Sequence, residues 1–211
     1  MLASGSCLLT DVVDKLHEPS KKINVVDRLS KHLDKGTPAS AAASYLQQVR
    51  NWVPAAPVIH IDDSDVVKQD GYKFESLGIV RDGSESTSTK NVYKKRYHVT
   101  EACVLTTSNH PVSIFSKIHS SAEKGYKSAN VITFEAMEQG AALFKRATFC
   151  MDRGYDDNKM FLKLDELQQD YVIRLTAKRK LFFHGKWVPA IQLRNQRKDK
   201  IKTALTYKGQ K

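Results

Sequence analysis

Two aspartates stand just after short apolar segments, and their type and placement suit metal chemistry. Asp63 comes after the apolar run 58–61, and Asp152 follows the run 149–151. If the two runs are neighbouring strands of one sheet, the aspartates meet although they lie far apart in the sequence. Paired carboxylates are hard oxygen ligands that suit Mg²⁺ or Mn²⁺. Two such ions activate a water or a 3′-hydroxyl and stabilise the leaving oxygen, which is the chemistry of phosphodiester cleavage and strand transfer.

Each aspartate also has a purely structural interpretation. Asp62, Asp63 and Asp65 suit a solvated turn after a strand, because Asp side chains bond to nearby backbone in turns. Asp152 suits the N-cap of a helix that follows it. The residues alone leave both interpretations open.

The segments that would position these aspartates predict an α/β fold. Apolar residues recur at helical spacing in residues 12–33 and again in 38–52, and Pro54 and Pro57 then break regular structure. Strand-like runs come next, interrupted by a polar stretch rich in Gly, Ser and Thr at residues 68–89. The predicted strands are 58–61, 97–107, 112–118, 148–151 and 171–175, and the predicted helices are 132–147 and 158–168.

Two pairs of strands are predicted to form hairpins. Residues 97–107 and 112–118 are separated by a short polar turn, so we expect them to pair antiparallel. Residues 181–183 and 186–188 flank His184-Gly185 and predict a second, smaller hairpin. Strands, then a helix, then alternating strand and helix is the order of a layered α/β fold.

Positive charge is concentrated toward the C-terminal end of the chain. The net charge is +11, of which residues 1–57 contribute +2, residues 58–152 contribute zero and residues 153–211 contribute +9. A basic segment of this kind is typical of a protein that binds a polyanion, most often nucleic acid. A solvated basic tail that keeps the protein soluble is the alternative.

Cysteine usage and hydropathy indicate a protein of the cytoplasm with no membrane partner. Cys7, Cys103 and Cys150 have no paired spacing, as expected for reduced thiols rather than for a disulfide framework or a zinc site. No apolar run approaches the roughly 18–20 residues that a membrane span needs, and the first residues lack the pattern of a secretory signal.

Four segments together resemble the transposase DDE domain of bacterial insertion sequences. They are Ile61-Asp62-Asp63-Ser64-Asp65, Lys73-Phe74-Glu75-Ser76-Leu77-Gly78, Val80-Arg81-Asp82-Gly83-Ser84 and Phe149-Cys150-Met151-Asp152-Arg153-Gly154-Tyr155-Asp156. The resemblance covers residues 58–175. It implies a ribonuclease-H-like catalytic core over that range, with a mixed sheet and flanking helices. A helical segment, residues 1–57, would precede the core, and residues 176–211 would begin a basic, β-rich insertion.

The resemblance also implies a site and a partner. Asp63 and Asp152 would be catalytic residues and ligands of a two-metal site holding Mg²⁺ or Mn²⁺, with Asp62 and Asp65 as lesser candidates for the first ligand. The partner would be DNA at the transposon ends, bound by a homodimer or by this chain paired with a full-length transposase. Residues expected to contact DNA phosphates are Arg153, Lys178, Arg179, Lys180, Lys186, Arg194, Arg197 and Lys198.

The sequence departs from the family pattern at its third acid. Family members carry a Glu on a later helix, whereas the only Glu after Asp152 is Glu166, at the wrong spacing and in the wrong surroundings. We therefore expect a chain cut off inside the insertion, with two of three acids and little transposition activity. A smaller departure is Arg96, which stands where the family often has a glycine and would crowd a tight turn.

Three functions from different classes follow. The first is a DDE-type DNA transposase, cleaving phosphodiester bonds and transferring strands, that lacks its catalytic Glu. The second is a non-catalytic DNA-binding or dominant-negative transposase fragment. The third is an unrelated metal-dependent nuclease of ribonuclease-H-like fold, which would need a further acid near the two aspartates, with Glu135 and Glu138 as the candidates.

Overall fold

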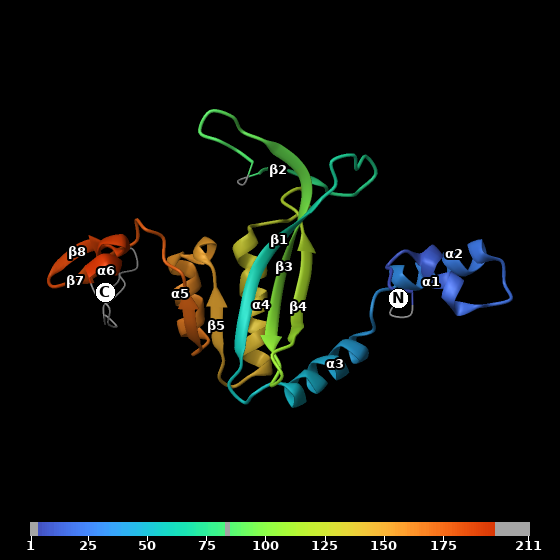
Figure 1. Cartoon of the computed structure of the whole chain (residues 1–211), viewed down its shortest axis with the longest axis horizontal. Helices are drawn as coiled ribbons and strands as arrows, with labels where there is room; N and C mark the ends of the chain where they lie inside the picture. The colour runs from blue at the N-terminus through green and yellow to red at the C-terminus, as the bar shows by residue number, and fades with distance from the viewer. Residues whose placement is uncertain (1–3, 83–84, 197–211) are drawn as a thin grey trace. The chain divides into compact units, whose positions relative to one another are not determined.

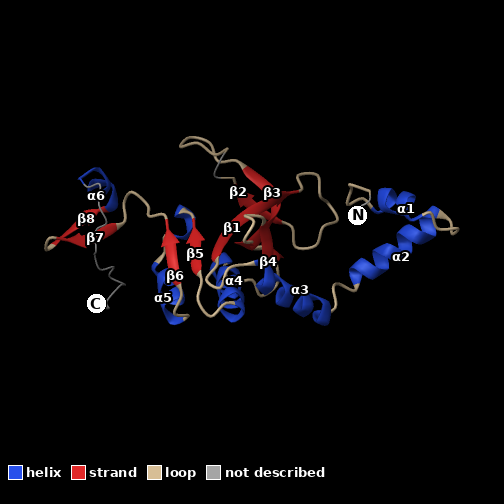
Figure 2. Ribbon diagram, turned by 60° about the horizontal axis from the view of Figure 1, so that its bottom comes forward, coloured by secondary structure: helices blue, strands red, loops and turns tan. Residues whose placement is uncertain are grey.

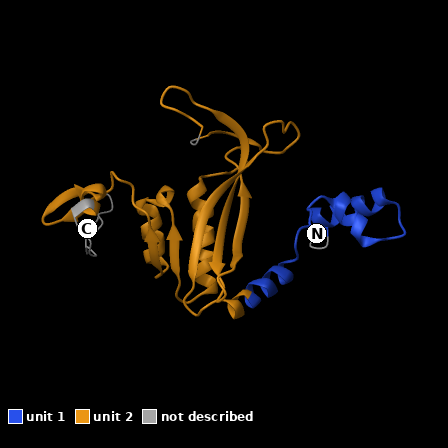
Figure 3. Ribbon diagram, viewed as in Figure 1, with its two compact units in different colours: residues 1–48 blue, residues 49–211 orange. Residues whose placement is uncertain are grey.

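The computed structural model of the chain describes residues 4–82 and 85–196. The chain divides into two units, residues 1–48 and 49–211 (Figure 3). The first unit contains α1 (Leu9–Leu16), α2 (Lys22–Asp34) and most of α3 (Ala39–Trp52). Val13 and Val25 are buried, and Lys22 on α2 pairs with Asp14 on α1 at 2.7 Å. The helices predicted for residues 12–33 and 38–52 are confirmed, the first of them as two helices.

A six-stranded mixed sheet forms the centre of the second unit (Figures 1 and 2). Strand β3 pairs antiparallel with β1 on one side and with β2 and β4 on the other, and β5 and β6 continue the sheet beyond β1 in parallel. The strands are β1 (Val58–Val67), β2 (Gly78–Arg81), β3 (Tyr93–Leu105), β4 (Pro111–His119), β5 (Thr148–Met151) and β6 (Asp170–Ile173). The predicted antiparallel hairpin is confirmed as β3 and β4.

Helices flank this sheet, so the predicted mixed sheet with flanking helices is confirmed. Helix α4 (Ala129–Leu143) connects β4 to β5 and packs on β1, β3 and β4. The short 3₁₀ helix η1 (Arg153–Tyr155) and α5 (Asn158–Glu166) then connect β5 to β6. The core beneath α4 consists of fully buried apolar side chains on alternating strand positions: Ile59, Ile61, Ala102, Val104 and Phe149.

Helix α4 approaches the sheet closely at Gly140. A Cβ atom there would lie 2.8 Å from Cδ1 of Ile59 and 2.9 Å from Cζ of Phe149. Both of these side chains are fully buried. Glycine at this position therefore sets how near the helix lies to β1 and β5.

Strand β1 is longer than predicted, and this changes the setting of the first aspartates. The prediction ended the strand near Ile61, but β3 pairs with β1 from Ile59 to Val67. Asp62, Asp63 and Asp65 therefore lie inside a strand, and the interpretation as a solvated turn is wrong. Strand β2 lies in the polar stretch for which no strand was predicted, and among the described residues it pairs with β3 alone.

Arg96 lies within β3 and meets no tight turn, so the expected crowding does not occur. Its side chain is 6% exposed. The guanidinium pairs with Asp65 and donates to the carbonyl of Arg81. A glycine here would remove the cation that links β1 to β2.

The second predicted hairpin is confirmed as β7 (Lys180–Phe183) and β8 (Lys186–Pro189). His184 and Gly185 both have positive φ, 48° and 75°, as a two-residue turn matching the strand twist requires. Helix α6 (Ala190–Gln196) follows and was not predicted. Among helices formed by residues 4–82 and 85–196, none combines enough length with enough hydropathy to traverse a lipid bilayer.

Candidate active site

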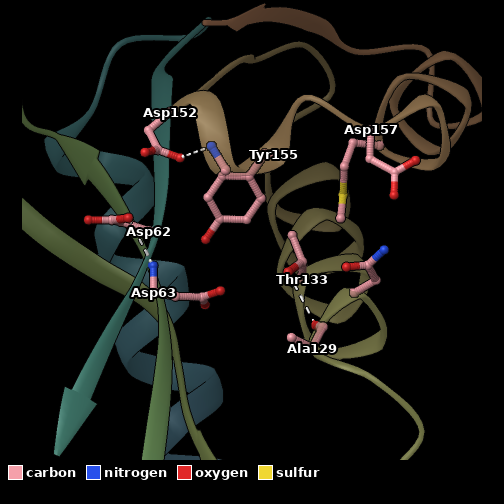
Figure 4. Close-up of a pocket in the computed structure, with 10 residues that line it drawn as sticks. Asp62, Asp63, Ala129, Thr133, Asp152, Tyr155 and Asp157 are labelled. Carbon is pink, nitrogen blue, oxygen red and sulfur yellow. Dashed lines mark hydrogen bonds between the residues drawn. The ribbon is translucent and has the colours of Figure 1, made fainter. Parts of the chain in front are cut away.

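The sheet brings the two predicted aspartates together. Strands β1 and β5 are parallel neighbours with Ile61 opposite Met151, so Asp152 follows β5 at the level of Asp62, and Asp63 lies one residue further along β1. Both line one pocket of about 380 Å³, and Asp62 lines it as well (Figure 4). The side chains are positioned by the register of two central strands and not by a flexible loop.

The carboxylates at this pocket have no cationic partner. No lysine, arginine or histidine in residues 4–82 and 85–196 forms an ion pair with Asp62, Asp63 or Asp152. A fourth carboxylate, that of Asp157, lines the same pocket. In a chain of net charge +11, this group of unpaired acids makes a locally negative site that attracts cations.

The N-cap role considered for Asp152 is confirmed, and its side chain also lines the pocket. Its Oδ1 accepts a hydrogen bond of 2.6 Å from the backbone N–H of Gly154 and so caps η1. The side chain nevertheless lines the pocket and is exposed. The cap fixes the orientation of the carboxylate, and its other oxygen stays available for a ligand.

Tyr155 lies among the three carboxylates. Figure 4 shows its ring between Asp152 and the Asp62–Asp63 pair, with the hydroxyl toward that pair. The residue is 6% exposed, and burial raises the pKa of the hydroxyl far above its usual range, with further increases from Asp63 and Asp62. Within the described residues the hydroxyl has no hydrogen-bond partner of acceptable geometry, although Asp63 acts on its pKa. A buried donor aimed at a pocket favours a polar ligand there.

A buried threonine on the neighbouring strand β3 forms a hydrogen bond to Asp63. Oγ1 of Thr100, on β3, donates a hydrogen bond of 2.5 Å to Oδ1 of Asp63. Oγ1 of Thr100 also lies 3.0 Å from Nε2 of His119 on β4. A hydroxyl has one proton to donate, so the proton between Thr100 and His119 belongs to Nε2. The contacts form a chain in which His119 donates to Thr100 and Thr100 donates to Asp63.

His119 is suited to this role because it is buried and neutral. The side chain is 1% exposed, and its ring is stacked between His98, at 5.6 Å between centroids, and Tyr126, at 6.0 Å. Burial lowers the pKa of the imidazole below its usual value, while Asp63 acts in the opposite direction. Nδ1 has no partner among the described residues, as expected for the tautomer that carries its proton on Nε2.

The other acids considered from the sequence are engaged elsewhere. Asp65 pairs with Arg96 and, at 2.8 Å, with Nδ1 of His98. The possible third acids also have lysine partners and do not line the pocket: Glu135 pairs with Lys117 at 2.6 Å, and Glu138 and Glu166 pair with Lys163 at 2.7 and 3.5 Å.

The donor atoms at the pocket are of the type that suits a hard divalent cation, but their number is small for one. The candidate ligands are carboxylate oxygens, which Mg²⁺ and Mn²⁺ prefer. In the part of the chain that the structure describes, however, no three His, Cys, Asp or Glu side chains are grouped so as to hold a metal ion. The pocket therefore supplies carboxylate oxygens of a suitable kind, but not grouped as a complete ligand set within the described residues.

The residues predicted to contact DNA phosphates fall into three groups. Arg153, Lys178, Lys180, Lys186 and Arg194 are exposed. Arg179 is engaged within the protein: it bonds to Asp156 at 2.7 Å and to Asn158, and it lies over the ring of Phe161. Arg197 and Lys198 lie outside the described residues.

A comparison with family models gives no match, and a comparison with curated proteins gives none either. Asp63 on β1 and Asp152 directly after β5 line one pocket, and a buried chain of hydrogen bonds lies behind Asp63.

Proposed function

We propose that this protein is a DDE-type DNA transposase, which cleaves phosphodiester bonds at transposon ends and transfers strands with Mg²⁺ or Mn²⁺. One observation carries the proposal: Asp63 on β1 and Asp152, directly after the neighbouring parallel strand β5, line one pocket, and neither forms an ion pair with a described lysine, arginine or histidine. Paired, uncompensated carboxylates are the arrangement that metal-dependent phosphodiester chemistry uses.

The order of the sheet supports a ribonuclease-H-like core. Three antiparallel strands, β4, β3 and β1, are followed across the sheet by β5 and β6 in parallel with β1. Helix α4 makes the connection from the antiparallel to the parallel part. This is the mixed sheet with flanking helices that the resemblance to the transposase family implies.

The roles of the residues follow from their positions. Asp63 and Asp152 would hold the metal, which when bound supplies a Lewis acid and an activated oxygen nucleophile. His119 and Thr100 keep one oxygen of Asp63 occupied and so fix the direction of the other. Tyr155 closes the inner side of the pocket and presents a hydroxyl toward the reacting group. Arg153, directly after Asp152, would contact a DNA phosphate.

A second candidate is a protein that holds transposon DNA without cutting it. The observation that favours it is that no described Glu lines the pocket: Glu135, Glu138 and Glu166 all pair with lysines elsewhere. Two carboxylates bind a metal more weakly than three and align the reacting groups less well.

The test is to measure Mn²⁺ affinity by titration calorimetry and nicking of supercoiled DNA on the same protein. Asp63→Asn and Asp152→Asn are each expected to lower the affinity by about tenfold or more, because each removes a charged ligand. Asp27→Asn, which removes an exposed carboxylate from α2 in the other unit, should leave it unchanged.

The two readouts separate the candidates. Metal-dependent nicking that both substitutions abolish supports the transposase, whereas metal and DNA binding without nicking supports the DNA-holding protein. Mn²⁺ binding that neither substitution weakens would show that the two aspartates are not metal ligands.

A further inference from the structure

An exposed row of alternating cationic and apolar side chains lies on the ribbon formed by β2 and β3. Cross-strand pairs place Ile79 beside Lys95 and Arg81 beside Tyr93, and residues two apart on a strand share a face. Tyr72, in the loop before β2, continues the row, since Nζ of Lys95 lies 4.6 Å from its ring centroid. We call Tyr72, Lys95, Ile79, Tyr93 and Arg81 the lysine–aromatic row.

The apolar members of the row are unusually exposed. Tyr72 is 85% exposed, Ile79 67% and Tyr93 56%. Scattered exposed apolar side chains are ordinary, but a contiguous group of them marks a binding surface. The opposite face of the same ribbon is turned inward, with Val80 half-buried and Arg96 buried. The row therefore belongs to the outer face of a defined ribbon.

The loop that carries Tyr72 is anchored to β3. The N–H of Lys68 donates to the carbonyl of Lys95 at 2.9 Å, and the side chain of Gln69 accepts from the N–H of Lys95 at 3.3 Å. The ring of Phe74 packs against Gly71, where a Cβ would lie 2.7 Å from the ring. Tyr72 is thus held out to solvent by a folded loop, as a preorganised contact requires.

The cations of the row have no acidic partner. Within the described residues, neither Lys95 nor Arg81 forms an ion pair, whereas the inward Lys94 pairs with Asp82 and Glu85. The loop also carries Asp70 and Glu75, which reduce the positive charge without pairing with the row. Unpaired cations interleaved with exposed rings suit a ligand that has both negative charge and flat apolar faces.

We propose that the lysine–aromatic row binds single-stranded DNA, stacking unpaired bases on Tyr72 and Tyr93 and contacting phosphates with Lys95 and Arg81. Aromatic rings stack with any base, and neighbouring cations follow the sugar–phosphate backbone. The inference rests on the proposed function in taking DNA as the ligand, and it adds a preference for unpaired strands.

The position of the row sets the path that a bound DNA strand would take. Strand β1 runs from Asp63 to Val67, which pairs with Arg96 next to Lys95. Four residues of strand span about 14 Å. Asp63 shares its sheet face with Arg96, whereas Lys95 is on the other face, so a DNA strand held at the aspartate pocket would pass around the edge of the sheet to reach the row.

The experiment measures fluorescence anisotropy of a labelled oligothymidylate and of a duplex of equal length, with the full chain and its variants. Tyr72→Leu and Tyr93→Leu keep an apolar side chain but remove the ring, so each should weaken single-strand binding by about tenfold. Tyr72→Phe keeps the ring and should bind within about twofold of the parent. Both tyrosines are exposed, so these changes should leave thermal unfolding unaltered.

Controls make the result specific. Tyr45→Leu, which removes a half-exposed ring from α3, should change nothing, and duplex affinity should be the same in all four variants. Single-strand affinity that Tyr72→Leu leaves intact overturns the proposal, as does equal weakening of duplex binding. A parent chain that binds no single strand also overturns it, while Mn²⁺ binding by Asp63 and Asp152 tests the proposed function separately. If the row bound an apolar protein partner instead, leucine would be tolerated there, and Tyr72→Leu would leave single-strand affinity intact.

Discussion

The chain of hydrogen bonds behind Asp63 depends on the protonation state of His119. His119 donates through Nε2 to Thr100, and Thr100 donates to Asp63. A second proton, on Nδ1, would be buried without an acceptor among the described residues. The folded protein therefore favours the neutral imidazole, and burial lowers its pKa accordingly.

This predicts that stability falls as the solution becomes acidic. In the unfolded chain the histidine titrates near its ordinary pKa of about 6.5. Below that pH the unfolded state binds a proton that the folded state does not bind. The contribution of His119 to stability is therefore complete above about pH 6.5 and is lost as the pH falls toward its lowered folded-state pKa, by up to about 1.4 kcal/mol per pH unit. His119→Gln keeps an N–H donor for Thr100 and should flatten this slope, as measured by urea unfolding between pH 5 and 8.

The matched control is His110→Gln, at an exposed position in the β3–β4 turn. It should leave the slope as it is in the parent. An unchanged slope in His119→Gln would mean that the buried imidazole takes up its second proton without difficulty.

At this scale the sequence predicted part of the site and could not predict the rest. Asp63 and Asp152 were recognisable because each stands where apolar strand residues give way to acids. Thr100 and His119 gave no such signal, since an isolated threonine and an isolated histidine acquire a role only through the register of β1, β3 and β4. The burial of Tyr155 among carboxylates depends on η1, which the sequence does not mark.

At the scale of elements, the contact of α4 with the sheet depends on Gly140. Gly140→Ala should raise helix propensity by about 1 kcal/mol but forces a methyl group against Ile59 and Phe149, both buried in a packed core. Overpacking of this kind costs about 1–3 kcal/mol, so we expect net destabilisation of up to about 2 kcal/mol in chemical unfolding.

Ala142→Ser, at an exposed position on the same helix, should change stability by less than about 0.5 kcal/mol. A Gly140→Ala protein more stable than the parent would show that α4 can move away from the sheet without loss.

The elements that the sequence predicted well are those whose apolar pattern decides them. The β3–β4 hairpin, α4, β5 and the β7–β8 hairpin all have such patterns. The continuation of β1 from Asp62 to Val67 was missed because polar residues occupy it, and only pairing with β3 keeps it extended. Strand β2 was missed because it has four residues and lies within a polar stretch rich in Gly, Ser and Thr; among the described residues it pairs with β3 alone.

At the scale of the whole molecule, charge is divided between an acidic pocket and a basic C-terminal region. Residues 153–211 have a net charge of +9, and Lys178, Lys180 and Lys186 are exposed. Each lysine that neutralises a phosphate contributes about 0.9 to the slope of log affinity against log salt concentration. Replacing these three with glutamine should therefore reduce the slope for duplex DNA by about 2–3, as measured by anisotropy at several salt concentrations.

Replacing Lys15, Lys21 and Lys35 with glutamine removes the same charge from exposed positions in the first unit and is the matched control. Equal reductions of the slope in both triple variants would mean that net charge, and not the basic C-terminal region, governs DNA binding.

The pairing of β1 with β5 also determines when the acidic pocket can exist. It joins Val58 to Thr148, roughly 90 positions later, so β2, β3, β4 and α4 all lie inside the loop that this pairing closes. Until that loop closes, Asp63 and Asp152 are on separate parts of the chain and cannot share a cation. The pocket therefore forms no earlier than this long-range pairing, so its time of formation in refolding reports on closure of a loop of roughly 90 residues.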